Sequence, residues 1–247
     1  MLAACSSEKP SYLEPHLTTL AATNITRTEA TLNGTAVVEG ETDMPQLNFR
    51  YGTTQQMELT SAPVQAKGSS VALLLSQLKA GTTYYYMLQG SNGRTTTTSN
   101  TMSFSTQPNE KPTMGTATIL SHGPMSVIIG YEIAEDGGED ITETGCYYAL
   151  GDGERQKVVA DGNVKSIKLR IGSLERNASY QIWPYAKNRV GETIGTAISF
   201  TTSDAIMLAE AGELTTLMGD NLYEYTTLSL AGALNGDDLA CLRKMMG

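Results

Sequence analysis

The 247-residue sequence has few of the residues on which most catalytic and metal sites depend, with only three cysteines and two histidines. Cys5, Cys146 and Cys241 are too few and too widely spaced for a disulfide framework or a metal site, although Cys146 could still pair with Cys241. His16 and His122 lie at no motif spacing from a serine, cysteine or carboxylate, so no catalytic relay is indicated. We therefore expect a protein that is not an enzyme and has neither a cofactor nor a metal.

Long apolar runs and clustered basic charge are also missing. No stretch of eighteen consecutive apolar residues occurs, which argues against a membrane-spanning helix. The 17 basic residues form no run and are outnumbered by 26 acidic ones, so we expect no nucleic-acid surface. The acidic stretch at 135–140 lacks the regular ligand alternation of calcium loops and is expected to be a solvated turn.

An internal repeat organises the sequence. The segment 174–202 repeats the pattern of 78–106, and further matches extend upstream at the same spacing of 96 residues. We predict that this shift holds through every strand, because apolar residues alternate with period two in both copies. The matched pairs are Gly34 and Gly130, Tyr51 and Tyr147, Leu78 and Leu174, Tyr84 and Tyr180, Asn92 and Asn188, and Phe104 and Phe200.

Short alternating segments separated by turn signals, without helical periodicity, indicate a mainly β protein. We predict two antiparallel β-sandwiches, each of about seven strands, followed by a small α/β segment. The predicted divisions are a tether at 1–15, sandwiches at 16–107 and 108–203, and a C-terminal segment at 204–247.

The repeated segment resembles the end of a fibronectin type III domain. Leu78, Thr82 and Tyr84 match the corner before that family's strand F, and the run 180–188 (YQIWPYAKN) with its terminal Ser-Phe-Thr-Thr is similar to strands F and G. The resemblance implies that Tyr84 and Tyr180 are tyrosine corners, with the ring in the core and the hydroxyl bonded to nearby backbone. Many family members have a tryptophan in the second strand, where this sequence has Leu32 and Ile128.

The N-terminus resembles the lipobox of bacterial lipoproteins. Leu2-Ala3-Ala4 precedes Cys5, and a polar Ser-Ser-Glu-Lys-Pro tether follows it. The resemblance implies that Cys5 is the lipidated first residue after cleavage, provided that an apolar leader lies upstream. It also implies a location at the bacterial cell surface or outer membrane, with contact to the membrane through the lipid anchor only.

The C-terminal segment 204–247 shows a different pattern. Helical spacing predicts helices at 207–218 and 238–246, with a short strand at 226–230 between them. The segment resembles the start of the leucine-rich repeats of bacterial surface proteins, and so few residues must lean on the second sandwich or remain weakly stable. Its expected core is Leu217, Leu228, Leu230, Leu234, Leu239 and Leu242.

Three aromatic residues form the candidate ligand site. If Tyr180 and the matched Tyr147 face inward, alternation turns Tyr148, Trp183 and Tyr185 outward on one sheet face. Such a patch suits sugar rings or a protein partner, unless it packs on the other domain or on the C-terminal segment.

These features favour a non-catalytic cell-surface lipoprotein that acts in adhesion or protein binding, with the sandwiches as a stalk. An alternative is a surface glycan-binding accessory protein of a polysaccharide-utilisation system. A third hypothesis, non-catalytic modules of a larger hydrolase, fits less well because a repeat region follows the sandwiches. The expected partner is thus a protein or glycan ligand at the cell surface.

Overall fold

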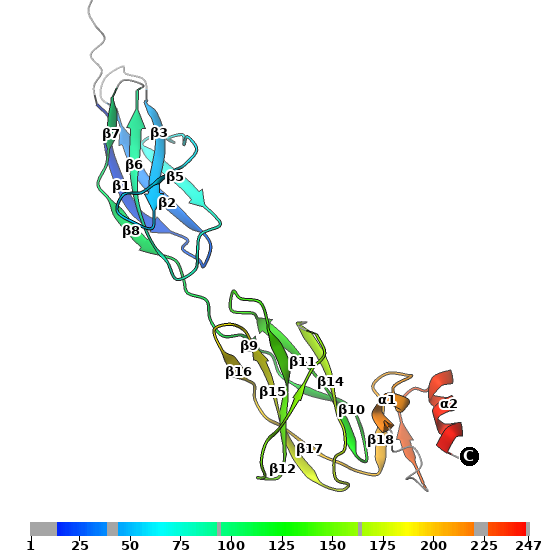
Figure 1. Cartoon of the computed structure of the whole chain (residues 1–247). Coiled ribbons are helices and arrows are strands. Elements are labelled where there is room, and N and C mark those ends of the chain that lie inside the picture. Colours follow the sequence, from blue (N-terminus) through cyan, green and yellow to red (C-terminus); the bar gives the residue numbers. More distant parts are fainter. Residues whose placement is uncertain (1–13, 39–43, 93–94, 163–164, 220–226, 246–247) are drawn as a thin grey trace, which may run out of the picture. The chain divides into compact units, whose positions relative to one another are not determined.

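The computed structural model describes residues 14–38, 44–92, 95–162, 165–219 and 227–245. The chain divides into two compact units, and the division lies between Asn109 and Glu110. Each unit contains a sandwich of two antiparallel sheets, as the alternation of apolar residues predicts (Figure 1).

The first unit has a three-stranded sheet and a five-stranded sheet. The three-stranded sheet has the order β1-β2-β5, formed by His16–Thr23, Ala30–Val37 and Ser70–Leu75. The second sheet has the order β4-β3-β6-β7, and β8 pairs with the other part of the β6 edge. Its strands are Leu59–Thr60, Gln46–Gly52, Thr83–Ser91, Thr96–Thr98 and Met102–Ser105.

The sandwich of the second unit has the same strand order. One sheet runs β14-β11-β10, with β9 also paired to β11, and comprises Ser166–Ile171, Ser126–Glu135, Thr118–Gly123 and Thr113–Met114. The other runs β13-β12-β15-β16, with β17 also paired to β15. Its strands are Gln156–Val159, Glu143–Leu150, Ser179–Lys187, Glu192–Ile194 and Ile198–Thr201.

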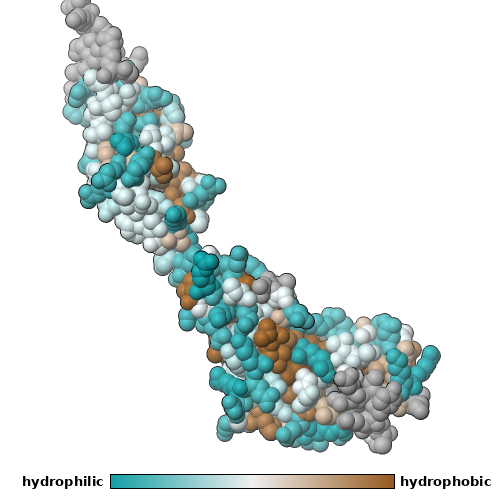
Figure 2. Space-filling model, in the orientation of Figure 1, coloured by the Kyte–Doolittle hydropathy of each residue, from teal (hydrophilic) through white to brown (hydrophobic). Residues whose placement is uncertain are grey.

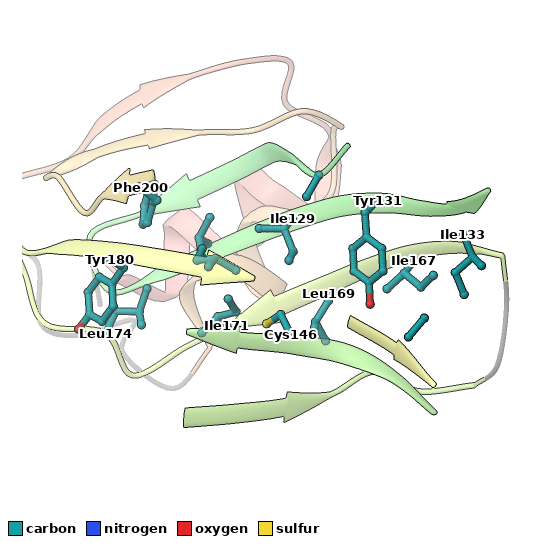
Figure 3. Packing of buried hydrophobic residues seen from close by; sticks show 14 residues of the cluster. Ile129, Tyr131, Ile133, Cys146, Ile167, Leu169, Ile171, Leu174, Tyr180 and Phe200 are labelled. Carbon is teal, nitrogen blue, oxygen red and sulfur yellow. The ribbon is translucent and has the colours of Figure 1, made fainter. Parts of the chain in front are cut away.

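Alternate residues of the two facing sheets fill each core. In the second sandwich, side chains from β11, β12, β14 and β15 meet between the sheets (Figure 3). Matching strands supply both cores, so the repeat in the sequence is a repeat of core positions. The second core contains Ile129, Tyr131, Ile133, Cys146, Ile167, Leu169, Ile171, Leu174, Tyr180 and Phe200.

Tyr84 and Tyr180 occupy equivalent corners. The Tyr84 hydroxyl accepts a hydrogen bond from the Lys79 N–H at 2.9 Å, and the Tyr180 hydroxyl accepts one from the Glu175 N–H at 2.8 Å. Both rings are buried in their cores. The predicted tyrosine corners therefore have the same geometry in both units, although Ala178 replaces the threonine of the first copy.

The shift between the copies is not constant, contrary to the prediction. Tyr84 pairs with Phe104 and Tyr180 with Phe200, which agrees with a shift of 96. On β12, however, it is Tyr148 that pairs with Ile182, whereas the equivalent pair on β3 is Tyr51 with Tyr86. The shift is thus 97 on β12, and likewise on β11, because the connection between β12 and β14 is one residue shorter than its counterpart.

The C-terminal segment extends a sheet of the second sandwich. β18, Ala205–Met207, pairs with the edge of β10, and β19, Ser229–Ala231, lies parallel to β18 (Figure 1). The predicted helix at 207–218 is wrong in its first half, since α1 spans only Leu214–Met218. The second helix, α2, spans Gly236–Met245, close to the prediction.

This segment covers the outer face of β11. Ile128 does not take the tryptophan position of the core but points to the opposite face, where it packs with Ile206 and Leu217. The run from Ser126 to Ile129 is therefore buried on both faces, whereas burial alternates along β2. Leu228, Leu230 and Leu242 join this cluster as predicted, but Leu234 and Leu239 are exposed, which corrects their assignment to the core.

Polar contacts fix the segment to the sandwich. The buried Ser121 hydroxyl donates to the Glu213 carboxylate at 2.5 Å, and Lys168 pairs with its other oxygen at 2.5 Å. Burial alone would raise the pKa of Glu213. The bonds from Lys168, from Ser121 and from the Glu210 N–H outweigh that effect and hold the pKa below its usual value.

A second buried carboxylate ties α2 to the start of α1. Asp238 accepts hydrogen bonds from the backbone N–H groups of Gly212, Leu214 and Asn235, at 2.6, 3.0 and 2.9 Å. The Asn235 side chain caps α2 by accepting hydrogen bonds from the N–H groups of Asp237 and Asp238. The two helices are thereby held as one small layer.

We predict that Glu213→Gln lowers the free energy of unfolding of the second unit by about 1–3 kcal/mol at neutral pH, because it removes a charge-assisted partner of Lys168. A carboxyl with a lowered folded pKa contributes stability above its unfolded value of 4.5, and this contribution is lost as the pH falls further. The variant should therefore show a shallower loss of stability in acid.

Urea denaturation followed by the fluorescence of Trp183, the single tryptophan, measures this effect within the second unit. Glu210→Gln is the matched control, because Glu210 pairs with the same lysine at 3.2 Å from an exposed position and should matter little. Equal stability of Glu213→Gln and the wild type would contradict the prediction.

Candidate functional site

The outer face of the sheet β13-β12-β15-β16 carries the candidate site. Tyr180 and Ile182 on β15 lie in the core, and alternation places Trp183 and Tyr185 on the opposite face, as predicted. Trp183 is partly exposed there. Tyr185 is fully buried although it lies on the outer face, which corrects the prediction that it is open to a ligand.

Tyr148 does not belong to this face. It pairs with the inward-facing Ile182, packs against the core and lies 6.2 Å from the Tyr180 ring. Its hydroxyl donates to the Gln156 side chain at 2.5 Å. The prediction used the 96-residue shift to place Tyr147 inward, and the actual shift of 97 reverses both side chains. Tyr147, opposite Trp183, is therefore the outward aromatic residue of β12.

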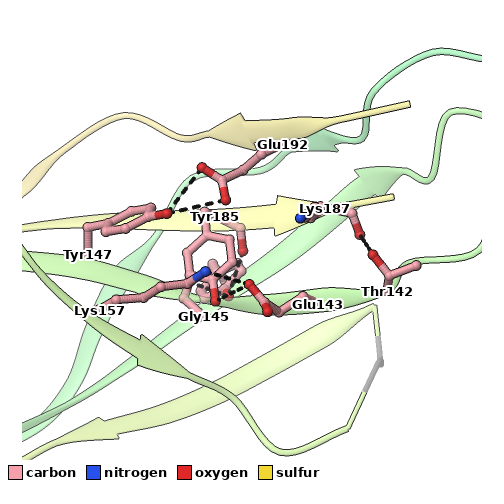
Figure 4. A network of polar contacts seen from close by, with 9 residues as sticks. Thr142, Glu143, Gly145, Tyr147, Lys157, Tyr185, Lys187 and Glu192 are labelled. Atoms are coloured by element: carbon pink, nitrogen blue, oxygen red, sulfur yellow. Dashed lines mark hydrogen bonds and ion pairs between the residues drawn. The ribbon is translucent and has the colours of Figure 1, made fainter. Parts of the chain in front are cut away.

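A polar network on the outer face encloses Tyr185 (Figure 4). The Tyr147 ring lies 5.0 Å away, the Lys157 ammonium lies 4.6 Å above the Tyr185 ring, and the hydroxyl donates to Glu143 at 3.0 Å. Lys157 in turn bonds Glu143 at 2.6 Å. Gly145 leaves the necessary space, since a Cβ there would come within 2.8 Å of the Tyr185 ring.

Trp183 has a cation of its own. The Arg155 guanidinium lies 4.0 Å from the centre of the indole ring, within the range of a cation–π contact. Val159 and Ile194 flank this region on the same face with 53% and 43% of their surface exposed. Apolar and charged side chains thus lie side by side on this face. Figure 2 shows exposed apolar and hydrophilic residues intermixed on the side of the second unit that it displays.

The network fixes its members in their charged or neutral forms. The hydrogen bond from Lys157, with one from Tyr185, lowers the pKa of Glu143. The same Glu143 contact raises the pKa of Lys157. Burial, followed by the bond to the Glu143 carboxylate, raises the pKa of Tyr185 far above its usual value. Tyr185 is therefore a neutral, structural hydroxyl. Lys157 is already paired with Glu143, which leaves the Arg155 guanidinium on Trp183 for a charged partner.

The cysteines and the acidic turn considered in the sequence analysis lie in structural positions. Cys146 and Cys241 are both free and buried, and burial raises the pKa of the Cys146 thiol to about 12. Asp136 in the acidic turn accepts from the Gly138 N–H and faces Lys165 at 3.7 Å. Across the described ranges, no three His, Cys, Asp or Glu side chains gather as metal ligands would. Cys5 lies outside the described residues.

Sequence reasoning missed Arg155, Lys157 and Glu143, which complete the face. Alternation could have placed Lys157 and Glu143 on one face of neighbouring strands. Their contact with Tyr185 depends on strand register, which the sequence specifies only weakly across a turn of this length.

No family model and no curated protein matches the chain. Among solved structures, a two-domain fibronectin type III segment of chicken tenascin aligns at 15% identity and a TM-score of 0.37, covering 76% of this chain and 98% of that one. Titin domains A168–A170 align at 13% identity and a TM-score of 0.36, over 77% of this chain and 67% of theirs. Three fibronectin type III domains of chicken CNTN1 align at 13% identity and 0.34, over 76% and 68%.

With TM-scores below 0.5, these matches are likenesses on which no assignment rests. The strand order described above gives the assignment itself: two fibronectin type III-like sandwiches and a small α/β segment. Tandem sandwiches of this kind are consistent with a stalk or a binding module.

We predict that Arg155→Ala increases the quenching of Trp183 fluorescence by acrylamide, because it uncovers the ring face on which the guanidinium lies. Stability should fall by about 1 kcal/mol or less, as expected for an exposed cation–π pair. Lys157→Ala is the control, since Lys157 lies over Tyr185 and Tyr147 instead. Unchanged quenching in Arg155→Ala would show that the guanidinium does not cover the indole.

Proposed function

We propose that the protein is a non-catalytic cell-surface lipoprotein that acts in adhesion or protein binding through the outer face of its second sandwich. The observation that carries the proposal is the composition of this face, where Arg155 and Lys157 stand over aromatic rings beside exposed Val159 and Ile194. Aromatic and arginine side chains in partly apolar surroundings are the groups that protein interfaces favour.

A protein ligand fits this face better than a glycan. Sugar rings stack on open aromatic faces, but Arg155 already lies on Trp183 and Tyr185 is buried. A glycan would have to displace the guanidinium, whereas an acidic protein surface could pair with Arg155 where it stands. Glycan binding, as in an accessory protein of polysaccharide utilisation, is therefore the second candidate.

The C-terminal segment supports a leucine-rich-repeat assignment. The residues paired between β18 and β19 are 24 apart in the sequence, each strand is followed by a helix, and the strands are parallel. That spacing lies within the leucine-rich-repeat range of 20–29 residues. In this arrangement the second sandwich would act as the cap that such stacks require, with Ile128 covering the first apolar layer.

The lipid anchor rests on the Leu-Ala-Ala-Cys sequence that ends at Cys5. No helix in the described parts of the chain has the length and apolar character needed to cross a bilayer. With lipid on Cys5, the two sandwiches would act as a spacer that holds the binding face away from the membrane.

Binding of the full chain to immobilised matrix proteins and to a glycan array tests the proposal. We expect binding on the protein panel, and Arg155→Glu should weaken it at least about tenfold, or 1.4 kcal/mol, because it reverses the charge over Trp183. Lys67→Glu makes the same charge change at an exposed lysine of the first unit and should leave binding unchanged.

The outcomes separate the two candidates. Binding confined to the glycan array, together with a saturable change in Trp183 fluorescence, would replace protein binding with the glycan function. Protein binding that Arg155→Glu leaves intact would show that this face is not the site.

A further inference from the structure

The two units differ where the first strand of each sandwich runs beside the segment that precedes its last strand, a boundary called the seam below. In the second unit a groove of about 520 Å³ lies between the backbones of two segments, 110–116 around β9 and 193–196 at the end of β16. This volume is typical of binding sites. The groove meets the aromatic face described above at Ile194, but Arg155, Lys157, Trp183 and Tyr185 do not line it, so the inference rests on different residues from the proposed function.

The corresponding seam of the first unit is closed by side chains. The Thr19 N–H donates to the Asn100 side-chain oxygen at 2.9 Å, and the Asn100 amide donates back to the Thr19 carbonyl at 3.1 Å. The Leu88 N–H donates to the hydroxyls of Thr19 and Ser99, both at 2.9 Å. Thr19 is buried as a result.

The second unit keeps the threonine of this seam but lacks the other three residues that close it. Strand register makes Thr116 the counterpart of Thr19, because Leu17 pairs with Ala36 as Met114 pairs with Ile133. The 96-residue shift of β6 and β8 makes the other counterparts Pro184, Gly195 and Thr196, in place of Leu88, Ser99 and Asn100.

These replacements depend on one another. Pro184 has no N–H for a hydroxyl to accept. A Cβ on Gly195 would come within 2.9 Å of the Pro184 ring, so a serine cannot be restored there without displacing that ring. Thr196 has no carboxamide with which to bridge the seam. The seam of the second unit is thus open because three residues differ together, at positions 184, 195 and 196.

The open seam leaves the backbone N–H and carbonyl of Thr116 available for hydrogen bonding. The Gly115 N–H donates to the Glu132 carbonyl at 2.8 Å, which sets the strand so that the next N–H points away from β11. Thr116 is exposed, and neither its N–H nor its carbonyl has a hydrogen-bond partner among the residues that the structure describes.

We propose that this groove binds an extended polypeptide segment, whose backbone pairs with the N–H and carbonyl of Thr116. The Asn100 carboxamide that fills the equivalent place in the first unit has the same donor and acceptor as a peptide group. A peptide group can therefore make, in the second unit, the two hydrogen bonds that the Asn100 carboxamide makes in the first. This is the strand-addition mode known for exposed strand edges. Met114 and the exposed Ile194 line the groove and offer apolar contact to a side chain of the peptide.

Nuclear magnetic resonance of the full chain tests the proposal with a blocked hexapeptide, Thr-Thr-Thr-Ser-Asn-Thr, the sequence of residues 96–101. We expect saturable shifts of the amide signals of 110–116 and 193–196 at millimolar peptide. The hydrogen exchange of the Thr116 amide should slow at least about tenfold on binding.

Two variants identify the pairing. Thr196→Asn restores the carboxamide of the first unit and should abolish peptide binding by closing the seam. Thr116→Pro removes the N–H and should weaken binding at least about tenfold. Ser199→Asn adds the same side chain at an exposed position of β17 outside the groove and should have no effect. The absence of saturable shifts, or shifts that both Thr196→Asn and Thr116→Pro leave unchanged, would overturn the proposal.

Discussion

The buried contact between Ser121 and Glu213 makes one folded unit of the second sandwich and the C-terminal segment. Ser121, on β10, donates to the carboxylate and accepts from the Ala209 N–H, while Lys168 neutralises the charge. A buried carboxylate without these partners would cost far more than the packing around it could offset. With them in place, β18 continues the sheet, and the C-terminal segment covers Ile128 on the outer face of β11.

The alternation and the internal repeat were enough to predict two sandwiches, and the resemblance to fibronectin type III domains supplied their tyrosine corners. They could not show where the spacing between the copies changes from 96 to 97. The change arises in a connection whose length core packing does not constrain, and loops tolerate such changes at little energetic cost. The first helix of the C-terminal segment was predicted to begin too early because Ile206, Ala209, Leu214 and Leu217 recur at roughly helical spacing, whereas pairing with β10 makes Ala205–Met207 a strand.

The candidate site was half predicted for the same reason. On β15, the alternation of inward and outward side chains can be counted from Tyr180 within the same strand, so Trp183 and Tyr185 lie on the expected face. On β12, the inward and outward positions were inferred from the matching strand of the first unit. The shift there is 97 residues instead of 96, so Tyr147 faces outward in place of Tyr148. The burial of Tyr185 could not be foreseen, because it depends on Lys157 and Glu143, which meet over the ring only after the strands have paired. Because Lys157 is paired with Glu143, what the face offers a partner is the Arg155 guanidinium together with the Trp183 ring on which it lies.

Native-state hydrogen exchange on the full chain tests most directly whether the second sandwich and the C-terminal segment are one unit. The account predicts that the amides of Ile206 and Leu230 open with the same free energy as those of Ile128 and Ile129, because one sheet and one apolar layer join them. Ser121→Ala should lower the protection of Ile206 and Leu230 while leaving the core strand β15 protected. Wild-type exchange of the C-terminal amides at a much lower free energy than β11 would contradict this account and show that the segment folds apart from the sandwich.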